Sequence, residues 1–308
     1  MSSITIKNVA IVGGSGKLGS YILNELLAAG FNVTALSRES STATFPASVA
    51  VKKVNYDSLD SLKEALTGID AVVSAIATPA IGSQIKLIDA ANAAGVKRFI
   101  PSEYGIDTRN LGGAKIGQIL AGKIKTVDYL QEKAKENSNF TWTGIATGFF
   151  FDLNLQLGIF GLNAKTKTAE IYDSGNEPFP TSNVSFIGRA VAAVLKRPAE
   201  TANKYIAVAS FQPTRNQILQ IVEEETGTKW TVKHVSTDEL KKIGEEKLAK
   251  GDYSAFGELV RVHLYRDGEG HALKPGESAN ELLGLPAEED LRASLKEWLK
   301  KEGVSSKV

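Results

Sequence analysis

The fold is decided by the stretch VAIVGGSGKLGSYILNELLAAG, residues 9–30, in which a buried apolar run meets an amphipathic run through a glycine-rich turn. Gly13, Gly16 and Gly19 give the pattern GxxGxxG. Three demands explain glycine at such positions: a tight turn, close approach of a pyrophosphate to the backbone, and close packing of the helix on the strand. The stretch predicts a βαβ unit that binds a dinucleotide, and the alternative is an ordinary tight strand–helix turn.

The cofactor contacts expected at this turn come from the amide groups and the dipole at the start of the helix, which favour phosphate groups. We assign them to Gly13, Ser15, Gly16, Lys17, Leu18 and Gly19.

The residues after the second strand decide between NADP(H) and NAD(H). An acidic side chain there accepts a hydrogen bond from the ribose 2′-hydroxyl, whereas an arginine binds a 2′-phosphate. The run FNVTAL is followed by Ser37-Arg38-Glu39, and Lys17 in the glycine turn adds a second positive charge. Arg38 therefore favours NADP(H), with Glu39 pointing away. The alternative is that Arg38 is a solvated surface charge.

Strand-type and helix-type runs alternate through the first half of the chain. Such alternation produces right-handed βαβ crossovers and a parallel sheet, in the order of a Rossmann-type, doubly wound α/β fold. After about Phe151 helical patterns dominate. We expect residues 1–150 to form the NADP(H)-binding domain, and residues 151–308 to form a smaller, α-rich substrate-binding region that is partly interleaved with the sheet.

The expected elements follow from the spacing of apolar residues. We expect strands at Val9–Val12, Phe31–Leu36, Ala71–Ile76, Arg98–Ile100, Thr141–Ile145 and Tyr205–Ala209, helices at Leu18–Ala29, Leu59–Leu66, Gln84–Ala94, Gln118–Lys135, Ser185–Leu195, Arg215–Thr226, Thr237–Ala249 and Ala287–Lys300, and a frayed tail at Glu302–Val308.

Composition restricts the partners. The net charge is +1, which gives no sign of a nucleic-acid partner, and the absence of cysteine excludes disulfides, a thiolate nucleophile and cysteine-ligated zinc. His234, His263 and His271 lack metal-ligand spacing and lie in expected loops or helices, so we expect no metal site. No run approaches the roughly 18–20 apolar residues of a membrane span, and the amino end is typical of a first strand rather than a signal peptide. We expect a cytoplasmic protein that does not contact a membrane.

The carboxyl ends of the later strands should complete the site, because ligands of doubly wound sheets bind at that edge. Ser102 and Glu103 follow the fifth strand, although Glu103 could simply begin a helix, and Asn55–Asp57 should lie near the adenine. The phenylalanines of Phe149–Phe151 would suit an aromatic substrate or simply belong to the core. The further cofactor contacts expected at this edge are Ser74, Ala75, Ile76, Ala77, Thr147, Gly148, Phe149 and Phe150.

These motifs together resemble the NmrA-like and isoflavone reductase-like group of atypical short-chain dehydrogenases/reductases, and its fungal members above all. The resemblance rests on GGSGKLG (13–19), Ser37-Arg38, DSLKEALTGIDAVVS (60–74) and GVKRFIPSEYG (95–105). It implies a Rossmann domain with a smaller C-terminal substrate domain. It also implies NADPH-dependent reduction of phenylpropanoid-like compounds, as in the plant enzymes.

The resemblance carries over one catalytic residue. The plant enzymes place a lysine in a pattern like KxKVRRAIE, and the matching stretch KIKTVDYLQ begins at Lys123. One departure concerns a Ser-Ser-Asn-x-Phe segment of those enzymes, where this chain has ATGFF (146–150) with Gly148 in place of the asparagine. The glycine-containing loop of residues 106–122 is a second departure, and both leave the substrate open.

The helix itself also singles out Lys123. Spacings of three and four residues place Lys123 on one stripe with Leu120, Val127 and Leu130, the face expected to meet the sheet. A buried lysine has a lowered pKa and can act as a general acid or base, or it can stay charged and stabilise an oxyanion. The alternative is a lysine whose stem is buried while its charge reaches solvent. We expect Lys123 to be catalytic and to contact the cofactor.

A second motif competes on the same helix. Tyr129 and Lys133 match the YxxxK signature of ordinary short-chain dehydrogenases. Tyr129 lies six residues after Lys123, about 240° further round the helix, so the two side chains cannot both face one cofactor. We favour Lys123.

The motifs and the resemblance together imply an NADPH-dependent reductase of a small aromatic or phenylpropanoid-like molecule. Hydride would reach a conjugated, benzylic or carbonyl carbon, with Lys123 supplying a proton or stabilising an oxyanion. One alternative is a non-catalytic NAD(P)-binding redox sensor of NmrA type, which would regulate transcription through a protein partner. Another is an epimerase or isomerase that retains its cofactor.

Overall fold

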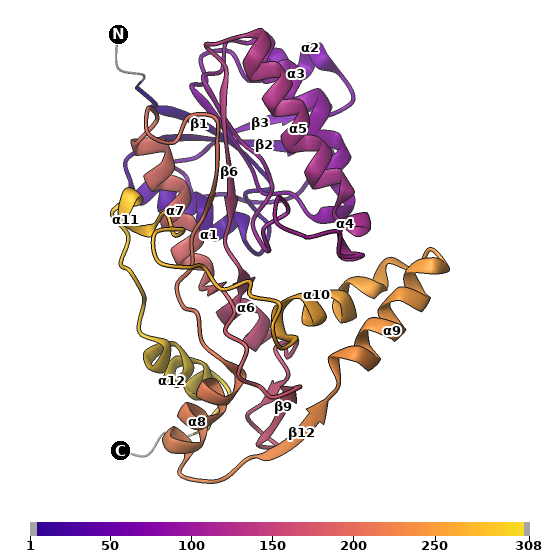
Figure 1. The fold of residues 1–308 in the computed structure, drawn as a ribbon. Helices are drawn as coiled ribbons and strands as arrows, with labels where there is room; N and C mark the ends of the chain where they lie inside the picture. The colour runs from indigo at the N-terminus through magenta and orange to yellow at the C-terminus, as the bar shows by residue number, and fades with distance from the viewer. Residues whose placement is uncertain (1–4, 305–308) are drawn as a thin grey trace.

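A seven-stranded parallel sheet organises the amino-terminal part of the computed structural model, which describes residues 5–304 (Figure 1). Its strand order is β11-β6-β5-β4-β1-β2-β3. The order reverses between β1 and β4, where two crossovers leave in opposite directions, and ligands of doubly wound sheets bind at this point. The strands are β1 (Asn8–Val12), β2 (Asn32–Arg38), β3 (Ala50–Val54), β4 (Ala71–Ser74), β5 (Arg98–Ile100), β6 (Thr141–Ala146) and β11 (Lys204–Ala207).

Helices cover both faces of this sheet, as apolar residues on both sides of its central strands require. On one face α1 (Gly19–Ala28) packs against α7 (Val184–Lys196), and Ile22, Leu26 and Val191 are fully buried there. The other face carries α2 (Leu59–Ala65), α3 (Gln84–Ala93) and α5 (Ala121–Glu136). The predicted doubly wound fold is therefore confirmed.

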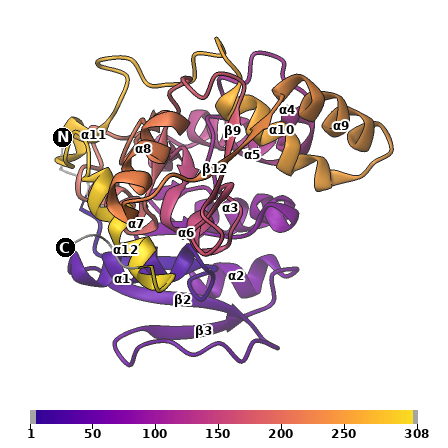
Figure 2. The ribbon, with the colours of Figure 1, turned by 90° about the horizontal axis from the view of Figure 1, so that it is seen from below.

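A second apolar core lies in the carboxyl-terminal part of the chain. In this core, the rings of Phe160, Tyr172 and Tyr265 lie around the buried guanidinium of Arg215, and Phe151 and Phe179 pack against these rings. A hairpin of α9 and α10 projects from the body (Figure 1), and Figure 2 shows β3 at the outer edge of the sheet. The elements are α6 (Phe151–Gln156), β8 (Leu162–Asn163), β9 (Thr168–Tyr172), α8 (Arg215–Thr226), β12 (Thr231–Val235), α9 (Thr237–Ala249), α10 (Phe256–Tyr265), α11 (Asn280–Leu283) and α12 (Leu291–Lys301).

Chain segments from the two parts cross over. Strand β11 pairs with β6 through Ile206 and Ile145, although Phe151, Phe160 and Phe179 of the second core lie between the two strands in the chain. Two short strands, β7 (Phe149–Phe150) and β10 (Thr181–Ser182), pair beyond the end of β6. The carboxyl edge of the sheet therefore faces residues from both parts of the chain.

Several expected element boundaries were wrong. The long helix begins only at Ala121, because Leu120 leaves helical geometry after the short helix α4 (Ile116–Ile119). The last helix begins at Leu291 rather than Ala287, since the Asp290 side chain caps it by accepting a hydrogen bond from the Ala293 amide. No sequence pattern predicted β3, β8, β9, β12 or α10. His234 lies in strand β12, so its expected position in a loop or helix was wrong. Within the expected frayed tail, the Val304 amide donates to the Leu299 carbonyl, and residues 305–308 lie outside the described part.

Candidate active site

The glycine turn follows β1 at the point where the strand order reverses. Gly13 has φ +80°, and a side chain there would collide with the carbonyl oxygen of Ala75. A side chain at Gly19 would collide with the Gly13 carbonyl, which also accepts a hydrogen bond of 2.9 Å from the Gly16 amide. The turn is thus folded tightly against the end of β4. Ser15, Gly16 and Lys17 are exposed at the start of α1, and Leu18 is half-buried.

Arg38 is the last residue of β2, where its backbone pairs with Val54 of β3. Its side chain is exposed, and its positive charge lowers the pKa of Tyr56 against the effect of burial, which raises that pKa to about 12. Lys53, on the neighbouring strand, donates to the Arg38 carbonyl at 3.4 Å. The cationic side chains of Arg38 and Lys53 therefore lie near Asn55–Asp57 at the ends of β2 and β3. The sequence had singled out only Arg38.

The end of β4 forms the next wall. Ser74 is fully buried and its hydroxyl has no partner among the described residues. The Ala75 amide donates to the Val12 carbonyl at 2.8 Å, which continues the β1–β4 pairing up to the glycine turn. The Ile76 carbonyl accepts from the Ser102 hydroxyl at 2.8 Å, which ties the ends of β4 and β5 together, whereas Ala77 is exposed.

The segment after β6 explains why this chain has a glycine where the plant enzymes have asparagine. Gly148 has φ +64°, and a side chain there would collide with the backbone of Pro180. The amides of Thr147 and Gly148 both donate to the Gly105 carbonyl, at 2.9 and 3.0 Å. The segment is therefore held against the turn that follows β5, and Phe149 and Phe150 stand half-buried beside it.

Lys123 lies in the first turn of α5 with 9% of its surface exposed. Its Nζ donates to the main-chain carbonyls of Glu103 and, at 3.4 Å, Tyr104. Burial lowers the pKa of Lys123, and the negative charge of Glu103 opposes that shift. A cavity of about 220 Å³ opens here, lined mostly by apolar side chains that include Tyr104, Ile106, Phe149, Phe150, Phe256 and Val260.

Tyr129 points elsewhere. Its hydroxyl donates to Asp89 of α3 at 2.5 Å, and the Lys133 ammonium lies over its ring. Tyr129 does not line the cavity at Lys123. The YxxxK pair is therefore engaged in packing α5 against α3.

Glu103 is buried below this cavity with 1% of its surface exposed. Its Oε2 accepts hydrogen bonds from the Thr108 hydroxyl at 2.6 Å and the Tyr205 hydroxyl at 2.9 Å, while Oε1 has no partner among the described residues. The ring of Tyr205 lies over Gly144, its neighbour across the β6–β11 pair. Glycine leaves this space free, because a side chain at position 144 would collide with the ring. Glu103 does not begin a helix. The interpretation of Glu103 as a helix-start residue was therefore wrong.

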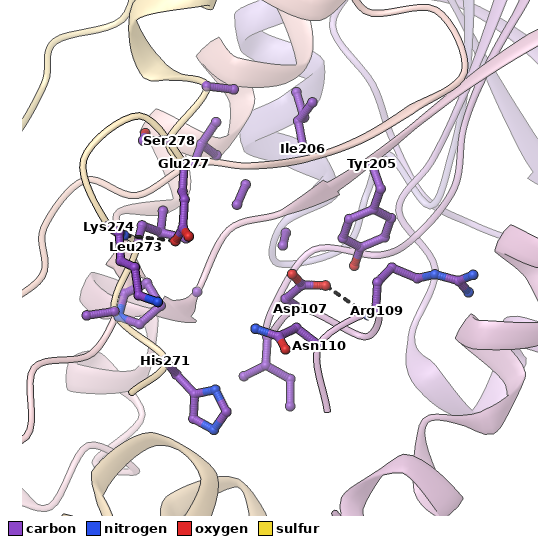
Figure 3. A pocket seen from close by; sticks show the side chains of 18 of the residues that line it. Asp107, Arg109, Asn110, Tyr205, Ile206, His271, Leu273, Lys274, Glu277 and Ser278 are labelled. Carbon is purple, nitrogen blue, oxygen red and sulfur yellow. Dashed lines mark hydrogen bonds between the residues drawn. The ribbon is translucent and has the colours of Figure 1, made fainter. Parts of the chain in front are cut away.

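A larger cavity of about 710 Å³ lies on the other side of the loop that carries Asp107 and Arg109 (Figure 3). One side of this cavity is lined by Asp107, Asn110 and the Tyr205 hydroxyl. The other side is lined by His271 and Glu277. His263, which also lines this cavity, stacks on His271 with ring centroids 3.6 Å apart, and burial lowers its pKa to about 3. No sequence pattern linked these residues, which come from distant segments.

The residues at this edge of the sheet fit a dinucleotide. Four buried polar atoms at or near the ends of β4 and β5 have no hydrogen-bond partner within residues 5–304, and a polar ligand could satisfy them: Ser74 Oγ, Gln84 Nε2, Glu103 Oε1 and Tyr104 OH. The glycine turn and exposed amides at the start of α1 fit a pyrophosphate.

In residues 5–304, no cluster of three or more histidine or acidic side chains is arranged to ligate a metal ion. Among the described helices, none has the length and apolar character needed to span a membrane.

Comparison with known proteins gives consistent matches. The sequence profile described as the NmrA-like family matches residues 5–265. The chain is 37% identical to "Oxidoreductase aprR" of Aspergillus flavus, over 92% of this chain and 95% of that protein, and 35% identical to "Oxidoreductase poxI" of Penicillium oxalicum, over 89% and 88%. Among solved structures, "AtPrR2 with NADP+ and (+)pinoresinol" superimposes with a TM-score of 0.77 at 24% identity, covering 90% of this chain and 94% of the other.

Proposed function

Since this chain is an oxidoreductase that belongs to the NmrA-like family, we propose that it reduces a small aromatic or phenylpropanoid-like molecule with NADPH. The observation that carries the proposal is the position of Lys123. Its amine lies at an apolar cavity beside the turn after β5, and the segment after β6 closes the same cavity. A related solved structure contains both NADP+ and the aromatic lignan pinoresinol.

Under this proposal, the glycine turn and the α1 amides hold the pyrophosphate, and Arg38 with Lys53 binds the 2′-phosphate. The preference for NADP(H) therefore rests on the positive charge at the ends of β2 and β3. Ser74–Ala77 and Thr147–Phe150 flank the remainder of the cofactor. When bound there, the cofactor would supply a hydride for reduction of a substrate carbon.

Lys123 provides the complementary proton. As the carbon accepts hydride, negative charge develops on the substrate oxygen, or on the carbon conjugated with it, and the Lys123 ammonium neutralises that charge by donating its proton. Phe149, Phe150, Phe256 and Val260 exclude water from the amine and offer apolar surface to an aromatic ring. Phe256 and Val260 belong to α10, which supports a substrate-binding role for residues 151–308.

The test measures NADPH oxidation with aromatic ketones, enones and lignan-like ethers, together with the dissociation constant of NADPH. Turnover with at least one of these classes is expected. Tight binding of the cofactor without turnover on any of them would instead favour the non-catalytic redox sensor, and turnover without net oxidation would favour an isomerase.

A further inference from the structure

Glu103 combines burial, a negative charge and proximity to the candidate proton donor. Its carboxylate is 99% buried on a chain segment whose main-chain carbonyl accepts a hydrogen bond from Lys123. Burying a carboxylate is costly unless other groups stabilise it. The Thr108 and Tyr205 hydroxyls do so at 2.6 and 2.9 Å, and Gly144 leaves the space in which the Tyr205 ring reaches across β6.

The contacts of Lys123 leave its reactive N–H available. An ammonium has three donors. Two of them have the carbonyls of Glu103 and Tyr104 as acceptors, and no ion pair within 4.0 Å joins Lys123 to an acidic side chain in residues 5–304. Glu103 therefore acts on the amine through its field rather than by occupying a donor, so one N–H can reach a substrate in the cavity.

Within residues 5–304, no other charged group competes for this role. Among the described residues, Glu103 is the one charged side chain that shifts the pKa of Lys123. The other side chains that line the cavity carry no charge, among them Thr78, Ile106, Leu120, Phe256 and Val260. The remaining titratable group, Tyr104, stays neutral because burial raises the pKa of its hydroxyl.

We propose that the Glu103 carboxylate is the positioning residue that keeps Lys123 protonated at its apolar cavity, so that Lys123 works as an acid. This inference rests on the proposed function of Lys123 as proton donor. Desolvation alone would drive a buried lysine toward the neutral amine. The Glu103 carboxylate, held by hydrogen bonds from Thr108 and Tyr205, offsets that effect. It does not accept the Lys123 proton that is to be transferred.

The test titrates Lys123 directly by NMR of protein labelled with ¹³C at lysine Cε, with the signal assigned by its loss in Lys123→Arg. Replacing Glu103 with glutamine removes the charge and keeps the shape. We expect the pKa of Lys123 to fall by about one unit or more in Glu103→Gln and to return toward the native value in Glu103→Asp. The matched control is Asp89→Asn, the same chemical change beside α5 at Tyr129, which should leave the titration unchanged. An unchanged titration in folded Glu103→Gln would overturn the proposal.

The pH profile of NADPH oxidation gives a second readout. If Lys123 donates the proton, activity falls as pH rises through its pKa, and in Glu103→Gln this limb moves to lower pH by the same amount as the NMR titration. A shifted NMR titration in a protein that turns over nothing would support the role of Glu103 and contradict the proposed function. Should Glu103→Gln not fold, the ¹³Cδ signal of Glu103 in the native protein decides: an ionised carboxylate throughout the titration of Lys123 supports the proposal, and a protonated one at pH 7 overturns it.

Discussion

The side-chain amine of Lys123 donates a hydrogen bond to the main-chain carbonyl of Glu103, twenty residues earlier in the chain. This contact joins the first turn of α5 to the turn after β5 and places a buried cation at the edge of the sheet. Its position has consequences for stability as well as for catalysis.

The first consequence is a pH dependence of folding. Burial lowers the pKa of Lys123 in the folded protein, so the unfolded chain binds the proton more tightly. The stability of the native protein relative to Lys123→Met should therefore rise with pH between the lowered pKa and the ordinary lysine value of about 10.5. Urea unfolding of both proteins at pH 7 and pH 10 measures this difference, and the tyrosines that titrate in the same range cancel between them. A stability difference that falls with pH would contradict the assigned direction.

Arg38 should determine the preference for NADP(H). Arg38→Ala is expected to weaken NADPH binding by about 10–100-fold, because charge-assisted hydrogen bonds to a phosphate are each worth roughly 1.5–3 kcal/mol. NADH binding should change little. Isothermal titration with both cofactors measures this, with Glu39→Gln as the control at the adjacent exposed residue. A native protein that prefers NADH would refute the assignment.

Gly148 should not tolerate the asparagine of the plant enzymes. Gly148→Asn combines an unfavourable φ of +64° with overlap on the Pro180 backbone, and a loss of at least about 3 kcal/mol of stability is expected. Gly30→Asn is the matched control, since Gly30 has φ +86° with open space around it, and it should lose about 1 kcal/mol or less. Thermal and urea unfolding compare the two. Equal losses would show that the contact with Pro180 carries no penalty.

Tyr129 should matter for packing rather than for turnover. Tyr129→Phe removes its hydrogen bond to Asp89 and should cost about 0.5–1.5 kcal/mol of stability. Steady-state rates of NADPH oxidation are expected to stay within about twofold of the native rates, since the hydroxyl lies outside the cavity at Lys123. A large fall in kcat with unchanged stability would restore the YxxxK interpretation.

The sequence predicted those features that depend on local patterns. The glycine turn, the alternation of strands and helices and the buried stripe of α5 each follow from spacings of a few residues, and the structure has the doubly wound sheet and a buried Lys123. Strand β3 was not predicted because an exposed edge strand such as Ala50–Val54 has little apolar pattern. Lys53 lies on this strand, so its position beside Arg38 was not predicted either. Tyr205, Phe256 and Val260 reach the site from more than 80 residues beyond Lys123. Their positions depend on the pairing of β11 with β6 and on the packing of α10, which no local spacing encodes.

The central claim is that Lys123 supplies the proton for an NADPH-dependent reduction, and the most direct test is the rate of NADPH oxidation in Lys123→Met with a substrate found for the native protein. Methionine keeps much of the length of the side chain and removes the proton. We predict a fall in kcat of about 10²–10⁴-fold, with a dissociation constant for NADPH within about threefold of the native value. A Lys123→Met protein that oxidises NADPH at the native rate would contradict the claim.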